Sequence, residues 1–298
     1  MTSATAASAD SRGARAVRAV SARPMELWRS RELLGQLVRK ELKVRYRNSA
    51  LGFLWSMLTP ALMTVVFSVV FTLVVPIPVD QFPAFFLAGY LLWQFLQNSC
   101  QGAIHSIVGN ADLVKKVYFP REVLPLSHVL AQLIHLVLAL LVIFPYLAAV
   151  RGPGVLVHLA GTFIAIGLLA LFVSGVAMWF AAVNVVIRDL QELFIVIFLV
   201  WFYATPVLYP LALARAELGG TSIVVRLLEL NPMTWFVEAF RTPLYGTVAE
   251  GAAGSIVSGP PMWASPRILA LAAAWAVVSF VLGYIVFLRR SRSFAKEV

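Results

Sequence analysis

The sequence of 298 residues has few charged residues, and this lack is the first clue to its class. Asp, Glu, Lys and Arg make up 13% of the chain, whereas a soluble domain carries about 25%. Six long stretches carry no charge at all: 48–79, 81–111, 123–150, 152–187, 193–214 and 268–288. Each is long enough for a membrane-crossing helix, which needs about 20 apolar residues.

The uncharged stretches also lack the alternation of apolar and polar residues that is typical of transmembrane β-strands. Inside a bilayer the backbone must satisfy its own hydrogen bonds, so these stretches favour α-helices. The sequence therefore predicts an all-α, polytopic membrane protein with six transmembrane helices. Their expected ranges are about 51–75, 82–106, 123–149, 155–183, 193–209 and 267–288.

Cysteine and buried acidic residues are scarce too. Cys100 is the single cysteine, which excludes a disulfide or a cysteine zinc site within one chain. No Asp or Glu lies in the middle of a predicted span, so a carboxylate proton relay is not expected. Two histidines, His128 and His135, share a helical face with Gln132. Without a nearby carboxylate they make a poor metal site, and we expect a polar face packed inside the bundle instead.

Motifs for nucleotide chemistry are missing. The chain has no G-x-x-x-x-G-K-[ST] loop, so it cannot hold ATP phosphates in that manner. It also has no D-x-D, H-E-x-x-H or G-x-S-x-G pattern, and no catalytic residue or cofactor is expected in it. An integral membrane enzyme of glycan assembly is the less favoured alternative. Four acidic residues stand near the predicted membrane surface without a catalytic pattern: Asp112, Glu122, Asp189 and Glu192.

The basic residues are unevenly placed. A net charge of +10 could indicate a nucleic-acid partner, but 19 of the 24 Lys and Arg fall on one side of a six-span topology. That side holds both termini and the loops at 107–122 and 184–192. By the positive-inside rule, both termini are expected in the cytoplasm and the protein in the cytoplasmic membrane, with no nucleic acid bound.

The N-terminal 47 residues fall into two parts. Residues 1–24 are rich in Ala, Ser and Arg without an apolar core, which predicts a disordered cytoplasmic tail and not a signal peptide. Residues 25–47 place leucines on one helical face and basic residues on the other. This pattern predicts an amphipathic helix in the membrane interface, which either anchors to anionic lipid or serves as a platform for a cytoplasmic partner.

Two short helical segments, "SIVVRLLEL" and "NPMTWFVEAFRTPLYG", follow the fifth predicted span. They are too short and too charged to cross a membrane, so we expect a pair of re-entrant helices on the outer side. Arg226 and Glu229 are spaced i, i+3, as are Glu238 and Arg241, so the members of each pair can meet on one face. Asn231 and the proline after it predict an N-cap and first turn.

The second predicted span carries one stripe of uncharged polar side chains: Gln94, Asn98, Gln101 and His105. Such a stripe is costly in lipid and should face protein or water. It either bonds neighbouring helices or lines a passage for a neutral polar molecule such as a sugar chain. The fifth span adds aromatic side chains that suit either the stacking of sugar rings or an interfacial belt. These are Trp201, Phe202 and Tyr203.

A charged stretch, "LVKKVYFPREVLPLS", separates the second and third predicted spans at 113–127. Asp112 can cap a short helix here, and Pro120 can end it. Such a helix at the membrane surface can dock into a cleft of another protein. The alternative is a solvated loop whose charges merely follow the positive-inside rule.

Five segments together carry a resemblance to a known family. They are "RKELKVRYRNSALGFLWSMLTPALM", "NADLVKKVYFPREVLPLS", "VNVVIRDLQEL", "ATPVLYP" and "NPMTWFVEAFR". Over residues 25–298 the chain resembles the permease subunit of type-2 ABC exporters that move polysaccharides such as O-antigen, teichoic acid, capsule and galactan. The resemblance implies one ABC type-2 transmembrane domain that pairs with a second copy of itself and with two separate ATPase subunits, which bind ATP and Mg.

The resemblance also implies a function. The chain would export a polyprenyl-diphosphate-linked polysaccharide across the cytoplasmic membrane, powered by the ATPase. An exporter of drugs or small lipids is the alternative within the same family. The resemblance assigns ATPase coupling to residues in two cytoplasmic loops: Asp112, Lys115, Lys116, Tyr118, Arg121, Glu122, Arg188 and Asp189.

Overall fold

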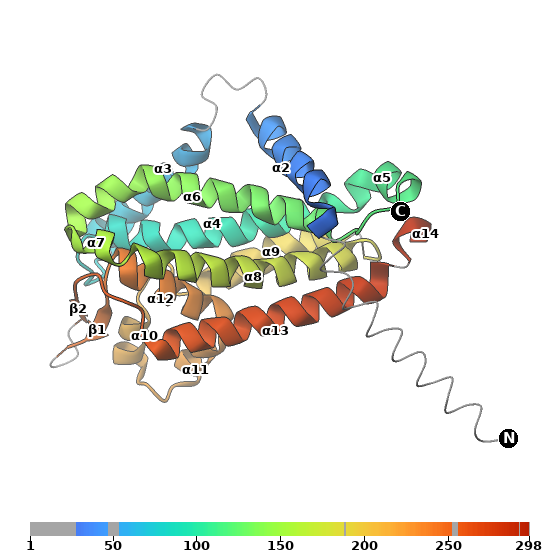
Figure 1. Ribbon diagram of the computed structural model, residues 1–298. Helices are drawn as coiled ribbons and strands as arrows, with labels where there is room; N and C mark the ends of the chain where they lie inside the picture. The colour runs from blue at the N-terminus through green and yellow to red at the C-terminus, as the bar shows by residue number, and fades with distance from the viewer. Residues whose placement is uncertain (1–27, 47–53, 188, 252–255, 292, 298) are drawn as a thin grey trace.

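The computed structural model describes residues 28–46, 54–187, 189–251, 256–291 and 293–297. The predicted N-terminal tail, the ends of the predicted interface helix and Arg188 lie outside these described residues. Long helices lie side by side along one axis, and the short elements gather at the two ends of this bundle (Figure 1).

Four segments of the described chain are long and apolar enough to cross a membrane. Three are single helices, and the first joins a helix to a π-helical turn. The nearly all-helical, multi-pass fold predicted from the sequence is therefore confirmed. The segments are Met57–Val74 within α3 (Leu54–Val69) and η1 (Val70–Val74), α6 (Val123–Arg151), α8 (Leu159–Asn184) and α13 (Pro266–Ser291).

The other two predicted spans differ from these four. Helix α4 (Phe82–Ser106) has 25 residues, but its polar stripe makes it less apolar. Helix α9 (Leu190–Tyr203) has 14 residues, or about 21 Å of length, which is shorter than the roughly 30 Å hydrocarbon core. The predicted range 193–209 overran this helix because Pro206 disfavours helical backbone at Thr205.

The predicted fourth span is divided. A short helix α7 (Gly154–Val157) precedes α8, and the chain reverses between α6 and α7 at Gly152, whose φ is +85°. A positive φ is easily adopted only by glycine. The division places the start of α8 beside the short elements at this end of the bundle (Figure 1).

Helix α4 forms the centre of the main hydrophobic core. It packs against α3, α6, α8 and α12, and most of its residues are buried. Helices α8 and α13 form the most extensive pair. Their backbones approach closely at Gly175 and Gly283, and the Ser279 hydroxyl donates to the Phe172 carbonyl at 3.0 Å. Small residues allow such close packing of membrane helices.

One end of the bundle carries three short helices and a β-hairpin, and the all-α prediction missed the hairpin. They are α10 (Leu211–Leu218), α11 (Ile223–Leu230), α12 (Pro232–Leu244), β1 (Val248–Glu250) and β2 (Ile256–Ser258). The strands pair antiparallel, with Val248 opposite Ser258. Arg151, at the end of α6, holds the chain on both sides of the hairpin by donating to the carbonyls of Tyr245 (2.6 Å) and Gly259.

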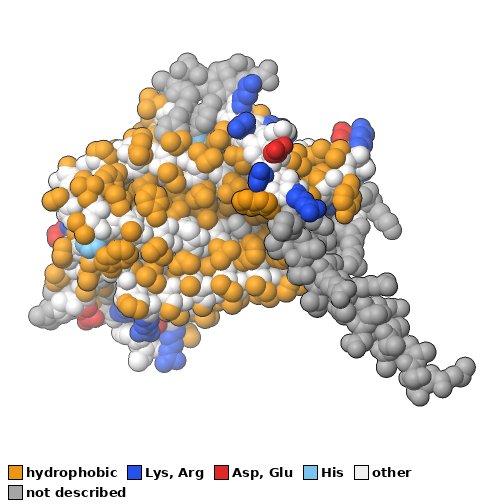
Figure 2. Space-filling view, viewed as in Figure 1, with side chains coloured by type: hydrophobic (Ala, Val, Ile, Leu, Met, Phe, Trp, Pro, Cys, Tyr) orange, Lys and Arg blue, Asp and Glu red, His pale blue; other side chains and the backbone are white. Residues whose placement is uncertain are grey.

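The opposite end carries α2 (Arg31–Tyr46), η2 (Val108–Asn110), α5 (Ala111–Lys116) and α14 (Phe294–Glu297). A second hydrophobic cluster joins these elements to the ends of α8 and α13: Leu37, Ile107, Val114, Val123, Leu124, Met178, Ala181, Ala182, Val185, Phe287 and Phe294. Hydrophobic side chains cover the length of the bundle, and charged side chains collect towards its ends (Figure 2). This distribution is expected for helices that cross a membrane.

Candidate passage and coupling surface

A polar cavity of about 330 Å³ lies between α2, α4 and α6. Three residues of the predicted stripe line it, whereas Gln94 does not. The histidine face of α6 lines the opposite wall, and α2 covers it. The polar lining residues are Glu41, Asn98, Gln101, His105, His128, Gln132 and His135. The structure therefore joins two patterns that the sequence shows separately, because the helices bearing them pack side by side.

Glu41 links α2 to this wall. Its carboxylate lies 3.4 Å from Nδ1 of His128. The His128 ring packs so closely on α4 that a Cβ on Gly102 would lie 2.7 Å from Nδ1. Sequence spacing cannot pair Glu41 with His128, because the two residues meet only through the packing of α2 on α6. Among the described residues, no group of three possible ligands is arranged to hold a metal ion.

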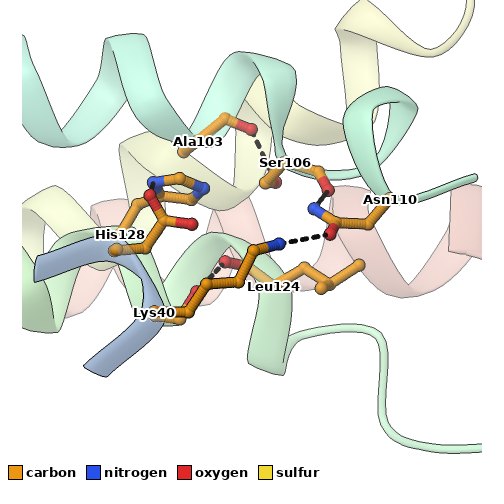
Figure 3. A network of polar contacts seen from close by, with 8 residues as sticks. Lys40, Ala103, Ser106, Asn110, Leu124 and His128 are labelled. Atoms are coloured by element: carbon orange, nitrogen blue, oxygen red, sulfur yellow. Dashed lines mark hydrogen bonds and ion pairs between the residues drawn. The ribbon is translucent and has the colours of Figure 1, made fainter. Parts of the chain in front are cut away.

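Lys40, next to Glu41, belongs to a neighbouring polar network (Figure 3). Its ammonium donates to the side-chain oxygen of Asn110 at 3.4 Å, and the Asn110 amide donates to the Ser106 carbonyl at 2.8 Å. Ser106 in turn donates to the Ala103 carbonyl. This chain of contacts ties α2 to the end of α4, where the predicted coupling segment, residues 107–122 between α4 and α6, begins.

The predicted aromatic residues of α9 separate in space. Trp201 and Tyr203 line an apolar groove of about 540 Å³ beside α11, together with Tyr209. Phe202 instead is buried in the core, where its ring lies 5.4 Å from that of Trp93. Of the three, only Trp201 and Tyr203 can therefore contact a molecule in this groove.

Asn231 connects the groove to the short helices. Its side-chain oxygen accepts from the backbone N–H of Met233 at 3.0 Å, so the predicted N-cap of α12 is confirmed. The same oxygen accepts from Nε1 of Trp201 at 2.9 Å, and its amide donates to the Ala204 carbonyl. One side chain thus fixes the end of α9 against the start of α12.

Arg241 is a buried charge that joins α12 to α4. Its side chain is 1% exposed, and its guanidinium lies 3.7 Å from the Phe85 ring centre. Nη2 donates to the carbonyls of Pro206 (3.1 Å) and Val207 (3.2 Å). The guanidinium fits because Gly89 has no side chain there.

The two predicted ion pairs of the short helices have different outcomes. Nη1 of Arg241 lies 3.6 Å from Glu238, so this i, i+3 pair forms. Glu229 was paired wrongly with Arg226: it accepts two hydrogen bonds from Arg215, at 2.6 and 3.1 Å. The reason is that α10 packs against α11 and brings Arg215 to Glu229, whereas Arg226 is exposed.

The predicted coupling segment forms a projecting surface at the end of the bundle. Helix α5 ends at Lys116 and not near Pro120, and Asp112 lies inside it instead of capping it. Asp112 and Lys116 form an exposed pair at 3.1 Å. Tyr118 is 98% exposed, and the Lys115 side chain is exposed as well. Asp189 is also exposed, at the start of α9.

Two residues assigned to coupling lie on the inner side of this segment. Arg121 donates from Nη1 to the carbonyl of Ser291 at the end of α13. Glu122 is 1% exposed. In this arrangement, Arg121 and Glu122 are placed to hold the segment against the bundle, whereas Lys115, Lys116 and Tyr118 face outward.

A family model described as the ABC-2 type transporter matches residues 32–245, from α2 to the end of α12. The chain belongs to the ABC-2 type transporter family. All described coupling and passage residues fall within this match. The resemblance seen in the sequence is therefore confirmed.

Individual proteins of known name are also similar to the chain in sequence. The chain is 36% identical over 220 residues to the O-antigen export system permease protein RfbA of Myxococcus xanthus, a match that covers 74% of this chain and 83% of that one. It is 34% identical over 179 residues to the protein of the same name from Klebsiella pneumoniae, covering 60% and 69%. A shorter match, 30% over 109 residues, covers 35% of this chain and 38% of the capsule polysaccharide export inner-membrane protein CtrC of Neisseria meningitidis.

Proposed function

We propose that this ABC-2 family chain is the membrane permease of an ABC transporter that exports a polysaccharide across the cytoplasmic membrane. The observation that carries the proposal is the 36% identity to an O-antigen export permease over 83% of that protein's length. The relatives named above act on O-antigen or capsule polysaccharide. None of them favours the alternative of a drug or small-lipid exporter, or of a glycan-assembly enzyme.

The permease crosses the membrane six times in this proposal. Helix α4 is the second span, because it lies along the other long helices and three of its polar residues, Asn98, Gln101 and His105, line a cavity shared with α2 and α6. Helix α9 is the fifth span, although it is short, and the turn at 204–210 completes its path. With both termini cytoplasmic, α5 lies at the cytoplasmic end, and α10 to α12 form the outer, re-entrant group.

The energy comes from a separate ATPase, to which ATP and Mg bind. The outward side chains of the coupling segment, Lys115, Lys116 and Tyr118, are the proposed contact with it. Family architecture supports two permeases with two ATPases. The exposed apolar sides of α3 and α9 are available to lipid and to the second copy.

The proposed substrate is a polyprenyl-diphosphate-linked glycan. The polar cavity near the cytoplasmic end and the aromatic groove near the outer end are the proposed contacts along its path. Both offer uncharged partners to a neutral sugar chain: amide and imidazole groups at one end, and the rings of Trp201 and Tyr203 at the other.

Gene deletion in the native host tests the proposal. We expect the deletion strain to lose a surface polysaccharide and to recover it when the gene is returned. The permease, purified gently in detergent, should carry an ABC ATPase with it. Unchanged surface polysaccharide in the deletion strain, with no ATPase recovered, would contradict the assignment.

A further inference from the structure

The cavity between α2, α4 and α6 is a built site whose ligand can be inferred from its chemistry. Its volume of about 330 Å³ lies at the lower end of the range for small-molecule pockets, about 300–1,000 Å³. Polar groups exposed to lipid are costly, so such a cavity contains water or a polar ligand. It is partly open, which gives a ligand access.

The described charges that line the cavity favour a neutral ligand over an anionic one. Among the lining residues that the structure describes, none is Lys or Arg, and one is an acid, Glu41. Of the lysines beside this wall, Lys40 is directed to Asn110 (Figure 3), and Lys43 is exposed and does not line the cavity. A diphosphate is recognised by Arg, Lys or a helix N-terminus, none of which is among the described groups that line this space. The diphosphate of a lipid-linked glycan would therefore bind elsewhere.

The uncharged groups instead match a sugar. Asn98, Gln101 and Gln132 each offer an amide that both donates and accepts, as a hydroxyl does. The imidazole of His128 and the carboxylate of Glu41 hold each other at 3.4 Å, which orients both before a ligand arrives. Leu42, Val44 and Ala131 supply apolar surface for the CH groups of a sugar ring.

We propose that this cavity binds a neutral sugar residue of the exported glycan as it enters the permease. The inference rests on the proposed function and adds to it the part of the substrate that is recognised. It also gives the polar stripe a divided role, in which Asn98 and Gln101 contact the sugar and Gln94, outside the cavity, does not.

The first test measures sugar binding directly. The full-length permease is placed in nanodiscs of phosphatidylethanolamine and phosphatidylglycerol, and methyl glycosides of glucose, galactose and mannose are titrated by saturation-transfer NMR. At least one glycoside should bind, and inorganic pyrophosphate should not displace it. Asn98→Leu/Gln101→Leu removes two hydrogen-bonding groups and should weaken binding about 25-fold, at about fivefold per neutral hydrogen bond. Gln94→Leu, on the same helix, should bind as the wild type does.

A second variant distinguishes a loss of sugar binding from a loss of folding. Val44 is 61% exposed at the cavity wall, so Val44→Trp should fill the space without removing a polar group or lowering the melting temperature. It should abolish glycoside binding. Failure of every glycoside to bind the wild type, or equal binding by Val44→Trp, would overturn the proposal.

Two further experiments identify the source of the bound sugar and distinguish a failure of this inference from a failure of the proposed function. Soluble oligosaccharide released from the host's surface glycan should displace the bound glycoside. Displacement by a glucosyl diacylglycerol in the nanodisc, but not by this oligosaccharide, would instead make the cavity a glycolipid site and refute the assignment. In cells, Val44→Trp should export less glycan. Normal export by this variant, in a host whose deletion strain exports none, would refute the inference and leave the proposed function unchanged.

Discussion

The seam, which is the close backbone contact between α8 and α13 at Gly175 and Gly283, allows the most specific prediction about stability. A Cβ added to Gly175 would lie 2.5 Å from the backbone nitrogen of Phe280, which is shorter than real Cβ contacts ever are. The two helices would have to separate by roughly 1 Å to restore ordinary contact distances. Overpacking of this kind costs about 1–3 kcal/mol. Gly175→Ala should therefore destabilise the protein even though alanine is the better helix former.

Gly167, on the same helix, is the matched control because a Cβ there has nothing within 4 Å. Both substitutions change helix propensity by the same amount, about 1 kcal/mol in favour of alanine, so their difference isolates the clash. In detergent, Gly175→Ala should melt several degrees below Gly167→Ala, at about 2–4 °C per kcal/mol for a chain of this order of size. Equal melting temperatures would refute the reasoning.

Gly283 extends the test across the same seam. A Cβ on it would lie 2.9 Å from Cα of Gly175, so Gly283→Ala should also lower the melting temperature. Once one substitution has separated the helices, the second should cost less. The double variant should therefore lose less stability than the sum of the two single variants, and strict additivity would argue against a shared seam.

The other predictions concern the two ends of the bundle. Arg241→Leu leaves the half-buried Glu238 without its partner and should cost about 1–3 kcal/mol; adding Glu238→Leu should restore part of the melting temperature, and no recovery would show that the pair is not the cause. Tyr118→Ala should change the free energy of unfolding by no more than about 0.5 kcal/mol while reducing the amount of ATPase that copurifies. Full ATPase recovery would exclude Tyr118 from the contact. In intact cells an impermeant maleimide should label Gly220→Cys, whereas Lys115→Cys should react only after permeabilisation; the reverse pattern would invert the topology.

Charge-free length and helical periodicity were enough to predict most of the long helices. The range 82–106 coincides with α4, and Asn231 caps α12 as expected. These features are local, because an apolar run of sufficient length or a capping residue acts within its own segment. Where local signals conflicted, the prediction was less accurate: the fifth helix ends at Tyr203 because the prolines that follow it outweigh the apolar composition of 204–209.

Tertiary partners could not be predicted from spacing. Arg226 and Glu229 satisfy the i, i+3 rule, yet Arg215 from another helix takes the carboxylate. Likewise, the sequence pointed to the polar stripe of α4 and the histidine face of α6 separately, and only the packing of the helices shows that they share one cavity with Glu41. Exposed pairs on single helices are worth only a few tenths of a kcal/mol, so a partner on a neighbouring element readily displaces them.

The inward position of Arg121 changes what a coupling residue can do. A side chain that contacts the ATPase directly should be exposed, as Tyr118 is, whereas Arg121 donates to Ser291 at the end of α13. Because α13 runs the length of the bundle against α8 and also contacts α12, a displacement of the coupling segment acts on a helix that reaches the short helices at the opposite end. Because the backbones of α8 and α13 lie against each other at Gly175, a shift of α13 also acts on α8. Loosening this seam should therefore affect both ends of the protein.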